Sequence, residues 1–214
     1  MKVLVTGASQ GIGLAVTELF LERGHEVIGI DVNPAGIKHE CYTHYLQDIR
    51  GELPEIDGVE ILVNNAGTQD EKEAVAINLM ANIAVSEKYA LQDKIHSVVF
   101  ITSASTRNGA EFPYYVASKG GITAYMKNLA GRLASYGATC NGIAAGGVIT
   151  PLNDHILNNE NLYHMVLNET LLNKWAESSE IAELVYYLTV VNKSITGEDI
   201  LIDNGEYLKS NFIW

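Results

Sequence analysis

Short apolar runs rich in β-branched residues alternate with longer stretches of helical periodicity along the chain. The apolar runs, each suited to a strand buried on both faces of a sheet, lie at residues 3–5, 26–30, 42–46, 60–63, 97–101, 139–144 and 199–202. Helical patterns lie between them at 12–23, 71–90, 114–135 and 179–190. This alternation predicts an α/β fold, a Rossmann-like doubly wound parallel sheet with right-handed crossovers.

The length of 214 residues suits one domain, and the sequence contains no linker or internal repeat. We therefore predict a single domain over residues 1–214, in which a polar, irregular segment at 147–173 forms a lid over a substrate. A strand starts almost at the first residue, so we expect no signal peptide. Cys41 and Cys140 are far apart and lack metal-ligand spacing, which predicts reduced thiols, a cytoplasmic protein and no metal site.

The formal net charge is −12. Such an acidic chain is repelled by polyanions, which argues against nucleic acid and acidic membrane surfaces as partners. No stretch approaches the roughly 20 apolar residues of a membrane span. These properties leave a small molecule as the expected partner.

The segment TGASQGIG at residues 6–13 places three glycines between the first predicted strand and the first predicted helix. Bare glycine backbone at a helix N-terminus can hold a phosphate through unpaired N–H groups and the helix dipole. The segment has no lysine at the position that a nucleotide-triphosphate loop requires, so that class is excluded. A glycine-rich turn without function is the alternative, and the segment alone does not decide between the two.

Asp31 ends the second predicted strand, where a doubly wound fold places an acidic residue on a ribose. No Arg or Lys follows before Lys38, so a 2′-phosphate would face an uncompensated carboxylate. A dinucleotide cofactor bound at this site is therefore predicted to be NAD rather than NADP. A solvated aspartate in a turn is the alternative for Asp31.

Tyr115 and Lys119 are four positions apart in a predicted helix, so that both lie on one helix face. A free phenol titrates near about 10, and a fixed positive charge beside it lowers that pKa toward the range useful for acid/base catalysis. Ser103 follows a predicted strand and could donate a hydrogen bond to a substrate oxygen, or could simply be a turn residue. Tyr114 competes with Tyr115, but its spacing to Lys119 rotates it off that face.

These residues resemble the short-chain dehydrogenase/reductase family, and the resemblance covers essentially the whole chain. Its motifs occur in order as the TGxxxGxG loop at 6–13, NNAG at 64–67, the serine Ser103, YxxxK at 115–119, NGIAAGGVITPL at 141–152 and ITGE at 195–198. The resemblance implies an oxidoreductase with a nicotinamide cofactor. It also implies a homo-oligomer, either a dimer or a tetramer.

Carried over residue by residue, the resemblance implies four catalytic residues. Tyr115 moves the proton to or from the substrate oxygen that Ser103 holds, Lys119 binds the nicotinamide ribose, and Asn78 supports a proton-relaying water. Asp48 is implied to touch the adenine. The full implied cofactor-binding set is Gly7, Ser9, Gln10, Gly11, Ile12, Gly13, Asp31, Asp48, Ile49, Asn64, Asn65, Ala66, Gly67, Tyr115, Lys119, Val148 and Thr150.

The chain departs from the family pattern at three places. Sixteen residues separate Asp31 from Asp48, and fourteen positions lead from Asn64 to Asn78, so the helices on this side of the sheet are expected to be short. Ala145 stands where the family has proline. The interval from Ser103 to Tyr115 is one residue shorter than usual.

The leading function is the NAD-dependent interconversion of a secondary alcohol and a ketone. Two alternatives remain, a dinucleotide-sensing regulatory protein on the same fold and a reductase of carrier-bound 3-oxoacyl chains. The sequence does not identify the substrate. His155 and His164 in the expected lid are interpreted as solvated side chains, and Trp214 as a residue that could pack into a neighbouring subunit or the active site.

Overall fold

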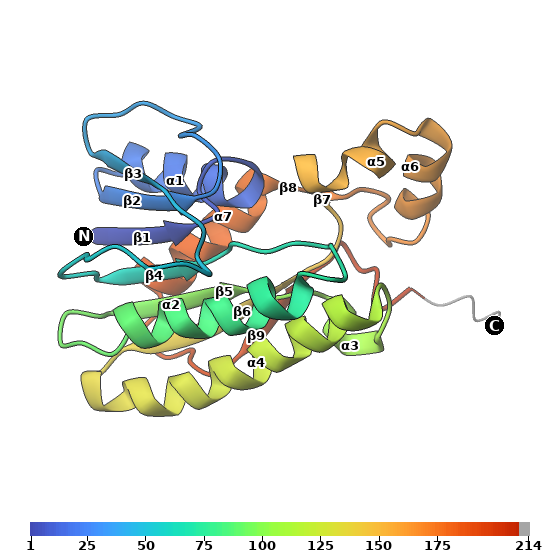
Figure 1. Cartoon of the computed structure of the whole chain (residues 1–214). Helices are drawn as coiled ribbons and strands as arrows, with labels where there is room; N and C mark the ends of the chain where they lie inside the picture. Colours follow the sequence, from blue (N-terminus) through green and yellow to red (C-terminus); the bar gives the residue numbers. More distant parts are fainter. Residues whose placement is uncertain (210–214) are drawn as a thin grey trace.

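The centre of the molecule is a parallel sheet of seven strands in the order β3-β2-β1-β4-β5-β6-β9 (Figure 1). A computed structural model describes residues 1–209, so Trp214 lies outside the described part. The strands are β1 (Lys2–Thr6), β2 (Glu26–Asp31), β3 (Tyr42–Leu46), β4 (Ile61–Asn64), β5 (Ser97–Ile101), β6 (Thr139–Ala145) and β9 (Asp199–Ile202). Each lies within one or two residues of a predicted run, and the predicted fold class is confirmed.

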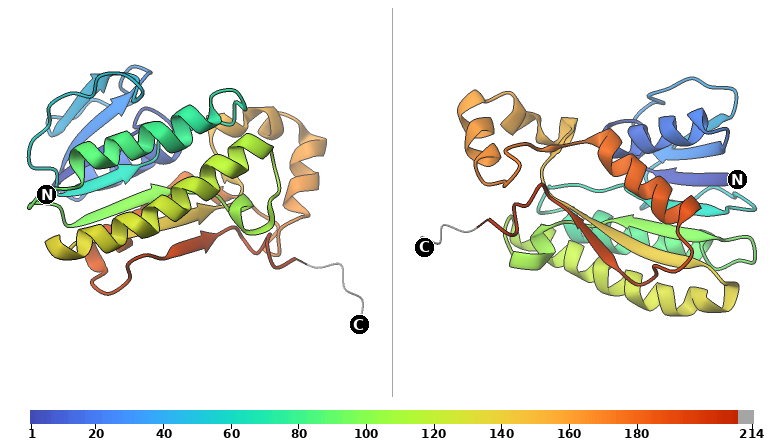
Figure 2. Two further views of the ribbon diagram at one scale, coloured as in Figure 1. Left: turned by 60° about the horizontal axis from the view of Figure 1, so that its bottom comes forward. Right: turned by 180° about the vertical axis from the view of Figure 1, so that it is seen from behind.

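Helices cover both faces of the sheet, as the two views of Figure 2 show. One face carries α1 (Gly11–Glu22) and α7 (Ser178–Tyr186), which extends into the π-helix η4 (Tyr187–Val191). The opposite face carries the π-helix η1 (Val75–Ala81), α2 (Asn82–Tyr89) and α4 (Pro113–Leu133), followed by the short 3-10 helix η2 (Ala134–Tyr136). Helices on both faces of a parallel sheet are the arrangement of a doubly wound fold.

Apolar side chains from alternate positions of each strand fill two cores. Leu4 and Leu62 point to the core under α2 and α4, whereas Val3, Val5 and Val63 point to the core under α1 and α7. All five are fully buried. Burial on both faces is the reason that the strands are continuous apolar runs rather than alternating ones.

The strand order reverses between β1 and β4, which are hydrogen-bonded neighbours that start the two halves of the sheet. Ligands of doubly wound folds bind at such a switch point, in the crevice outside the carboxyl ends of the strands. The segments that follow β1 and β4 therefore form the walls of the site.

The connections on either side of β3 contain no helix. Ten residues, 32–41, join β2 to β3, and residues 47–60 join β3 to β4. Helices that we expected to be short are absent there. Tyr42 covers part of the exposed sheet instead, with its phenol so close to Gly29 that a Cβ on that glycine would lie 2.1 Å from the phenol oxygen.

The predicted helix over 71–90 begins later than expected. Residues 71–73 form turns, in which the Asp70 carboxylate accepts the Lys72 backbone N–H at 2.9 Å. The π-helix η1 follows and leads into α2. The acidic run at 70–73 therefore caps a turn ahead of the helix rather than forming its first turn.

The segment at 147–173 is not the irregular loop that we expected. A two-residue strand β7 (Val148–Ile149) pairs with β8 (Ala176–Glu177) and encloses the helices η3 (Pro151–Asn153), α5 (Asp154–Leu157) and α6 (Glu160–Leu167). The Asn159 side chain caps α6 by accepting the Leu162 N–H at 3.2 Å. This helical excursion projects beyond the carboxyl end of the sheet in Figure 1.

Across residues 1–209, the structure contains no helix with the length and apolar character needed to cross a membrane.

Candidate active site

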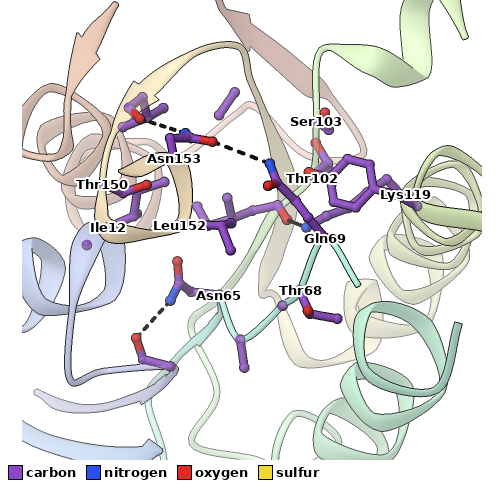
Figure 3. Close-up of a pocket in the computed structure, with 18 of the residues that line it drawn as sticks. Ile12, Asn65, Thr68, Gln69, Thr102, Ser103, Lys119, Thr150, Leu152 and Asn153 are labelled. Atoms are coloured by element: carbon purple, nitrogen blue, oxygen red, sulfur yellow. Dashed lines mark hydrogen bonds between the residues drawn. The ribbon is translucent and has the colours of Figure 1, made fainter. Parts of the chain in front are cut away.

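A pocket of about 740 Å³ lies along the carboxyl ends of the strands. It extends from the glycine segment after β1 to Ser103 and Tyr115, and the 147–173 segment lines it as well. In Figure 3, Ser103 and Lys119 lie on one side of the pocket, opposite Ile12 and Thr150. The volume falls within the range of small-molecule sites.

The glycine segment brings bare backbone to the pocket. Gly7 and Gly11 have φ of +68° and +55°, a region that side chains disfavour. At Gly13, an added Cβ would lie 1.9 Å from the Gly7 carbonyl oxygen, so α1 packs directly on the turn. No side chain caps α1 at Gln10. The first-turn N–H groups therefore remain available to an anion.

Asp31 is buried at the end of β2, where it is 6% exposed. One carboxylate oxygen accepts the Ser9 N–H at 2.9 Å, and the other accepts the Asn33 N–H at 2.8 Å. These bonds fix the carboxylate beside the glycine segment. Each oxygen keeps a lone pair for a ligand hydroxyl.

An ion-pair cluster occupies the rim beyond Asp31. The Arg50 guanidinium contacts Asp48 with an Nη2 to Oδ2 distance of 2.6 Å, and it also binds Glu73. Hydrogen bonds from Arg50 hold the pKa of Asp48 below its ordinary value. No sequence motif singles out Arg50, because its contact with Glu73, 23 positions away, forms only in the folded chain.

Asn65 joins the segment after β4 to the glycine segment. Its side-chain amide donates to the carbonyls of Thr6 and Gly7, each at 3.0 Å. The Thr6 hydroxyl accepts the N–H groups of Asn65 and Ala66 at 3.1 Å. Two walls of the pocket are thereby held in fixed register.

Tyr115 and Lys119 are both buried on the face of α4 that meets the end of β5. The Lys119 ammonium donates to the Ile101 carbonyl at 2.8 Å. It also lies close behind Gly67, where an added Cβ would be 3.6 Å from Nζ. The predicted helix face is therefore formed, with the ammonium enclosed between β5 and the segment after β4.

The net shift of the Tyr115 pKa in the protein alone is upward, opposite to the direction expected from a neighbouring ammonium. Burial raises the pKa of Tyr115 to about 12, and the negative charge of Glu111 adds to the rise, whereas the Ser103 hydroxyl partly offsets it. Burial also lowers the pKa of Lys119 to about 8, against the opposing effect of Glu111 and Asp199. Desolvation outweighs the expected charge effect because both groups lie inside the protein.

Ser103 is 3% exposed and sits just past the end of β5. Its hydroxyl lies 2.8 Å from that of Ser105 and accepts the Ser105 N–H at 3.1 Å, at the start of α3 (Ser105–Asn108). The neighbouring Thr102 hydroxyl donates to the Asp199 carboxylate at 2.6 Å. Ser105 and Asp199 therefore fix the surroundings of Ser103, and no sequence pattern predicts either contact.

Asn78 lies behind the pocket wall in the π-helix η1. Its amide group pairs with the backbone of Thr68, accepting the N–H at 2.8 Å and donating to the carbonyl at 2.9 Å. It also donates to the Ser118 hydroxyl at 3.1 Å. The side chain thus ties the segment after β4 to α4, next to Tyr115 and Lys119.

Most of the residues singled out from the sequence line this pocket. They are Gly7, Gln10, Gly11, Ile12, Asp31, Asp48, Ile49, Asn65, Ala66, Gly67, Ser103, Tyr115, Lys119, Val148 and Thr150. Ser9, Gly13, Asn64 and Asn78 lie behind the wall. Of these, Asn64 donates to the Ser86 hydroxyl at 3.0 Å and supports the wall from the core.

Several pocket residues were not predicted. Gln69 and Asn153 reach across the opening and form a 3.4 Å hydrogen bond between the segment after β4 and η3 (Figure 3). Three glutamates, Glu111, Glu169 and Glu206, also line the pocket. Their positions follow no sequence motif, because separate loops bring them together.

The fold and the pocket together define a doubly wound α/β protein with a site at the switch point of its sheet. A family model described as Enoyl-(Acyl carrier protein) reductase matches residues 42–206. The chain therefore belongs to the short-chain dehydrogenase/reductase family. The predicted family and the predicted general class of enzyme, an oxidoreductase acting on CH–OH groups, are confirmed.

Two curated relatives illustrate the range of the family. The 3-oxoacyl-[acyl-carrier-protein] reductase FabG of Vibrio cholerae is 28% identical, with 96% of each chain covered. Glucose 1-dehydrogenase of Gluconobacter oxydans is 28% identical over 99% of this chain and 93% of the relative.

Solved structures share the fold over nearly the whole chain. A short-chain dehydrogenase family protein from Francisella tularensis has a TM-score of 0.84 at 27% identity, covering 97% of this chain and 99% of that one. A 4-hydroxyisoleucine dehydrogenase complexed with NADH has a TM-score of 0.87 at 24% identity, covering 98% and 99%. A putative 2-deoxy-d-gluconate 3-dehydrogenase from Agrobacterium tumefaciens with bound NADP has a TM-score of 0.87 at 24% identity, covering 97% and 96%.

Proposed function

We propose that the protein is an NAD-dependent oxidoreductase that interconverts a secondary alcohol and a ketone. The observation that carries this proposal is the continuity of one pocket. The glycine segment and Asp31 line one end of it, and Ser103, Tyr115 and Lys119 line the other. A dinucleotide and a small substrate can therefore share the pocket, with the reacting atoms beside the phenol.

The residues present fit a nicotinamide dinucleotide. Gly7 and Gly11 offer a cradle that a Cβ would obstruct, since Gly11 already lies against Thr150 and Gly7 against Asn65 and Ala66. The uncapped first turn of α1 suits the pyrophosphate. Asp31 is fixed in place to accept ribose hydroxyls.

NAD rather than NADP is supported by the charges around Asp31. A 2′-phosphate would add a dianion next to a buried carboxylate, which is electrostatically unfavourable. Arg50 is the one cation among the described lining residues at this end, and Asp48 and Glu73 already bind its guanidinium. Relatives of this fold bind NADH in one case and NADP in another, so the choice depends on this chain's own residues.

The remaining roles follow from the chemistry of the side chains. When bound, the nicotinamide ring supplies the hydride acceptor. Tyr115 takes the hydroxyl proton of the alcohol, and the Ser103 hydroxyl donates a hydrogen bond to the substrate oxygen. Lys119 binds the nicotinamide ribose and holds a positive charge beside the phenol. Asn78 supports a water that relays protons toward solvent, as the family resemblance implies.

Three further features belong to the same proposal. The 147–173 segment acts as a lid, supported by its contact through Asn153 with Gln69 across the pocket. The protein works in the cytoplasm, consistent with its free cysteines, Cys41 and Cys140. It assembles as a dimer or tetramer, as the family resemblance implies, and light scattering of the purified protein tests this.

A second candidate is a reductase of carrier-bound 3-oxoacyl chains, which the similarity to FabG favours. The formal net charge of −12 opposes it, because docking of an acidic carrier protein needs a surface of complementary charge. A dinucleotide sensor remains a third possibility. A sensor does not require a proton-transfer path, so the presence of Ser103, Tyr115 and Lys119 in one pocket argues against this function.

Absorbance of reduced nicotinamide tests the proposal directly. Purified protein mixed with NAD and a panel of secondary alcohols is expected to form the reduced cofactor. Acetoacetyl-pantetheine with NADH and NADPH tests the acyl reductase. Cofactor binding by calorimetry without turnover of any compound would favour the sensor instead, and absence of binding to both cofactors would exclude all three.

A further inference from the structure

The end of the pocket that contains Ser103 and Tyr115 is the substrate end. Carboxylates from distant parts of the chain lie there. Glu111 comes from the segment between α3 and α4, Glu169 follows α6, and Glu206 follows β9. Tyr115 lies at the same end and is close enough to Glu111 for that negative charge to raise the pKa of the phenol. The acidic cluster, Glu111, Glu169 and Glu206, therefore lies at the end of the pocket where the proposed alcohol oxidation takes place.

Positive charges do not balance this cluster. The ionisable cations and histidines that line the described pocket are Arg50, Lys119 and His155. Arg50 is paired at the opposite end, so Lys119 is the one lysine or arginine among the described lining residues that acts on Glu111, and three glutamates outnumber it. The substrate end therefore has a local excess of negative charge.

The carboxylates destabilise one another's charged forms. Loss of water raises the pKa of Glu111, Glu206 raises it further, and Lys119 opposes the rise. Loss of water also raises the pKa of Glu206, where Asp203 and Glu169 add to the rise and the Gly147 backbone amide opposes it. A cation placed between these groups would relieve the repulsion, whereas an anion would increase it.

An aromatic wall is a second, independent feature of this end. Trp175 is 7% exposed and lines the pocket, as does Tyr207. Gly147 lies so close to the indole that an added Cβ would be 2.2 Å from its ring nitrogen. Aromatic rings with nearby carboxylates form a usual setting for an ammonium group.

We propose that the substrate is a secondary alcohol that also carries a protonated amino group, which Glu111 and Glu206 bind. This inference rests on the proposed function and specifies its substrate class. In the oxidation, the carbinol hydrogen leaves as hydride to NAD and the hydroxyl proton goes to Tyr115, so the amine stays protonated and takes no part in the bond changes. Its charge fixes the orientation of the alcohol in the pocket.

Four matched probes separate this substrate class from the others. The probes 4-amino-2-butanol, 2-pentanol, 1,3-butanediol and 3-hydroxybutyrate share a secondary alcohol and end in an ammonium, a methyl, a hydroxyl and a carboxylate. At neutral pH the amine is protonated, as a lysine side chain is. We expect kcat/KM with NAD to be at least about tenfold higher for the amine than for 2-pentanol, and lowest for the carboxylate, since each 1.4 kcal/mol of binding energy is tenfold.

Glutamine substitutions identify the binding residues. In Glu111→Gln, Glu206→Gln and the double variant, the ratio of kcat/KM for 4-amino-2-butanol to that for 2-pentanol is expected to fall about tenfold or more, mainly through a higher KM for the amine. Glu160→Gln is the matched control. Glu160 lies on α6, is exposed and does not line the pocket, so this variant should behave like the parent.

Binding of the probes to the protein–NADH complex is measured alongside by calorimetry. If all four alcohols turn over but the amine ranks no higher than 2-pentanol, the inference is overturned while the proposed function stands. A first rank for the diol indicates a polyol site and overturns it equally. If none of the probes turns over, the proposed function fails for these compounds, and glutamate-dependent binding of the amine alone still decides the inference.

Discussion

The Nζ atom of Lys119 lies 5.8 Å from the centroid of the Tyr115 ring, and both side chains are buried. The ammonium donates to the Ile101 carbonyl, while desolvation raises the pKa of the phenol to about 12 and lowers that of the ammonium to about 8. Burial therefore opposes the activation of the phenol as a base. Under the proposed function, the positive charge of the oxidised cofactor is needed to complete the activation.

Replacing Tyr115 by phenylalanine should remove the proton acceptor without altering the cofactor cradle. General acid/base groups contribute about 10²–10⁴-fold to rates, and we expect a loss of kcat of at least that size. The affinity for NAD, measured by calorimetry, should stay unchanged. Tyr114→Phe is the matched control, because Tyr114 is 61% exposed on the same helix turn. Loss of activity in Tyr114→Phe with activity retained in Tyr115→Phe would reverse the assignment.

Glu111 should set the pH dependence of alcohol oxidation. Its negative charge raises the pKa of both Tyr115 and Lys119, so Glu111→Gln should lower both. Oxidation requires the deprotonated phenol and a charged Lys119, so the rising and falling limbs of kcat against pH should both move to lower pH. The profile is measured with a neutral alcohol, and Glu160→Gln should leave it in place. Limbs that do not move would show that Glu111 is electrostatically remote from the pair.

Asp31 should determine the choice of cofactor. Hydrogen bonds to charged groups contribute about 1.5–3 kcal/mol, so Asp31→Asn should weaken NAD binding roughly tenfold or more. The same change removes the repulsion toward a 2′-phosphate and should bring the affinities for NAD and NADP closer together. Calorimetric titration with both cofactors measures this. Asp93→Asn, at an exposed site outside the pocket, should change neither affinity. A parent protein that binds NADP as tightly as NAD would contradict the prediction.

Gly13 should be required for the packing of α1 on the glycine segment. A methyl group there would overlap the Gly7 carbonyl, and overpacking of this kind costs about 1–3 kcal/mol of unfolding free energy. Gly131→Ala provides the contrast, since that exposed site in α4 has no atom within 4 Å of the added Cβ. Alanine is the better helix former there by about 0.8–1.0 kcal/mol. Denaturant unfolding should thus move in opposite directions for the two variants.

Local patterns in the sequence were sufficient for the strands and the covering helices. A strand buried on both faces of a sheet needs apolar residues at consecutive positions, and such a run, for example at 97–101, is recognisable in the sequence. The face shared by Tyr115 and Lys119 follows from helix geometry alone. The absence of any helix between β2 and β3 was not foreseen, because the contact of the Tyr42 phenol with Gly29 joins residues of two different strands.

Only the folded structure shows which charged side chains lie close to one another. Arg50 reaches Glu73, and Glu206 lies near Glu111 although the two glutamates are 95 positions apart in the sequence. No periodicity connects such residues. The same limit applies to the pKa of Tyr115, which depends on how much water the surrounding loops exclude.

The sequence by itself determined the fold class, the family and the residue types available for catalysis, because these depend on spacing within single helices, strands and turns. The tertiary structure decided which charges meet, how deeply Tyr115 and Lys119 are buried, and that the substrate end of the pocket is acidic. Electrostatic energies depend on distance and solvent exclusion in three dimensions, and neither quantity is fixed by neighbours along the chain.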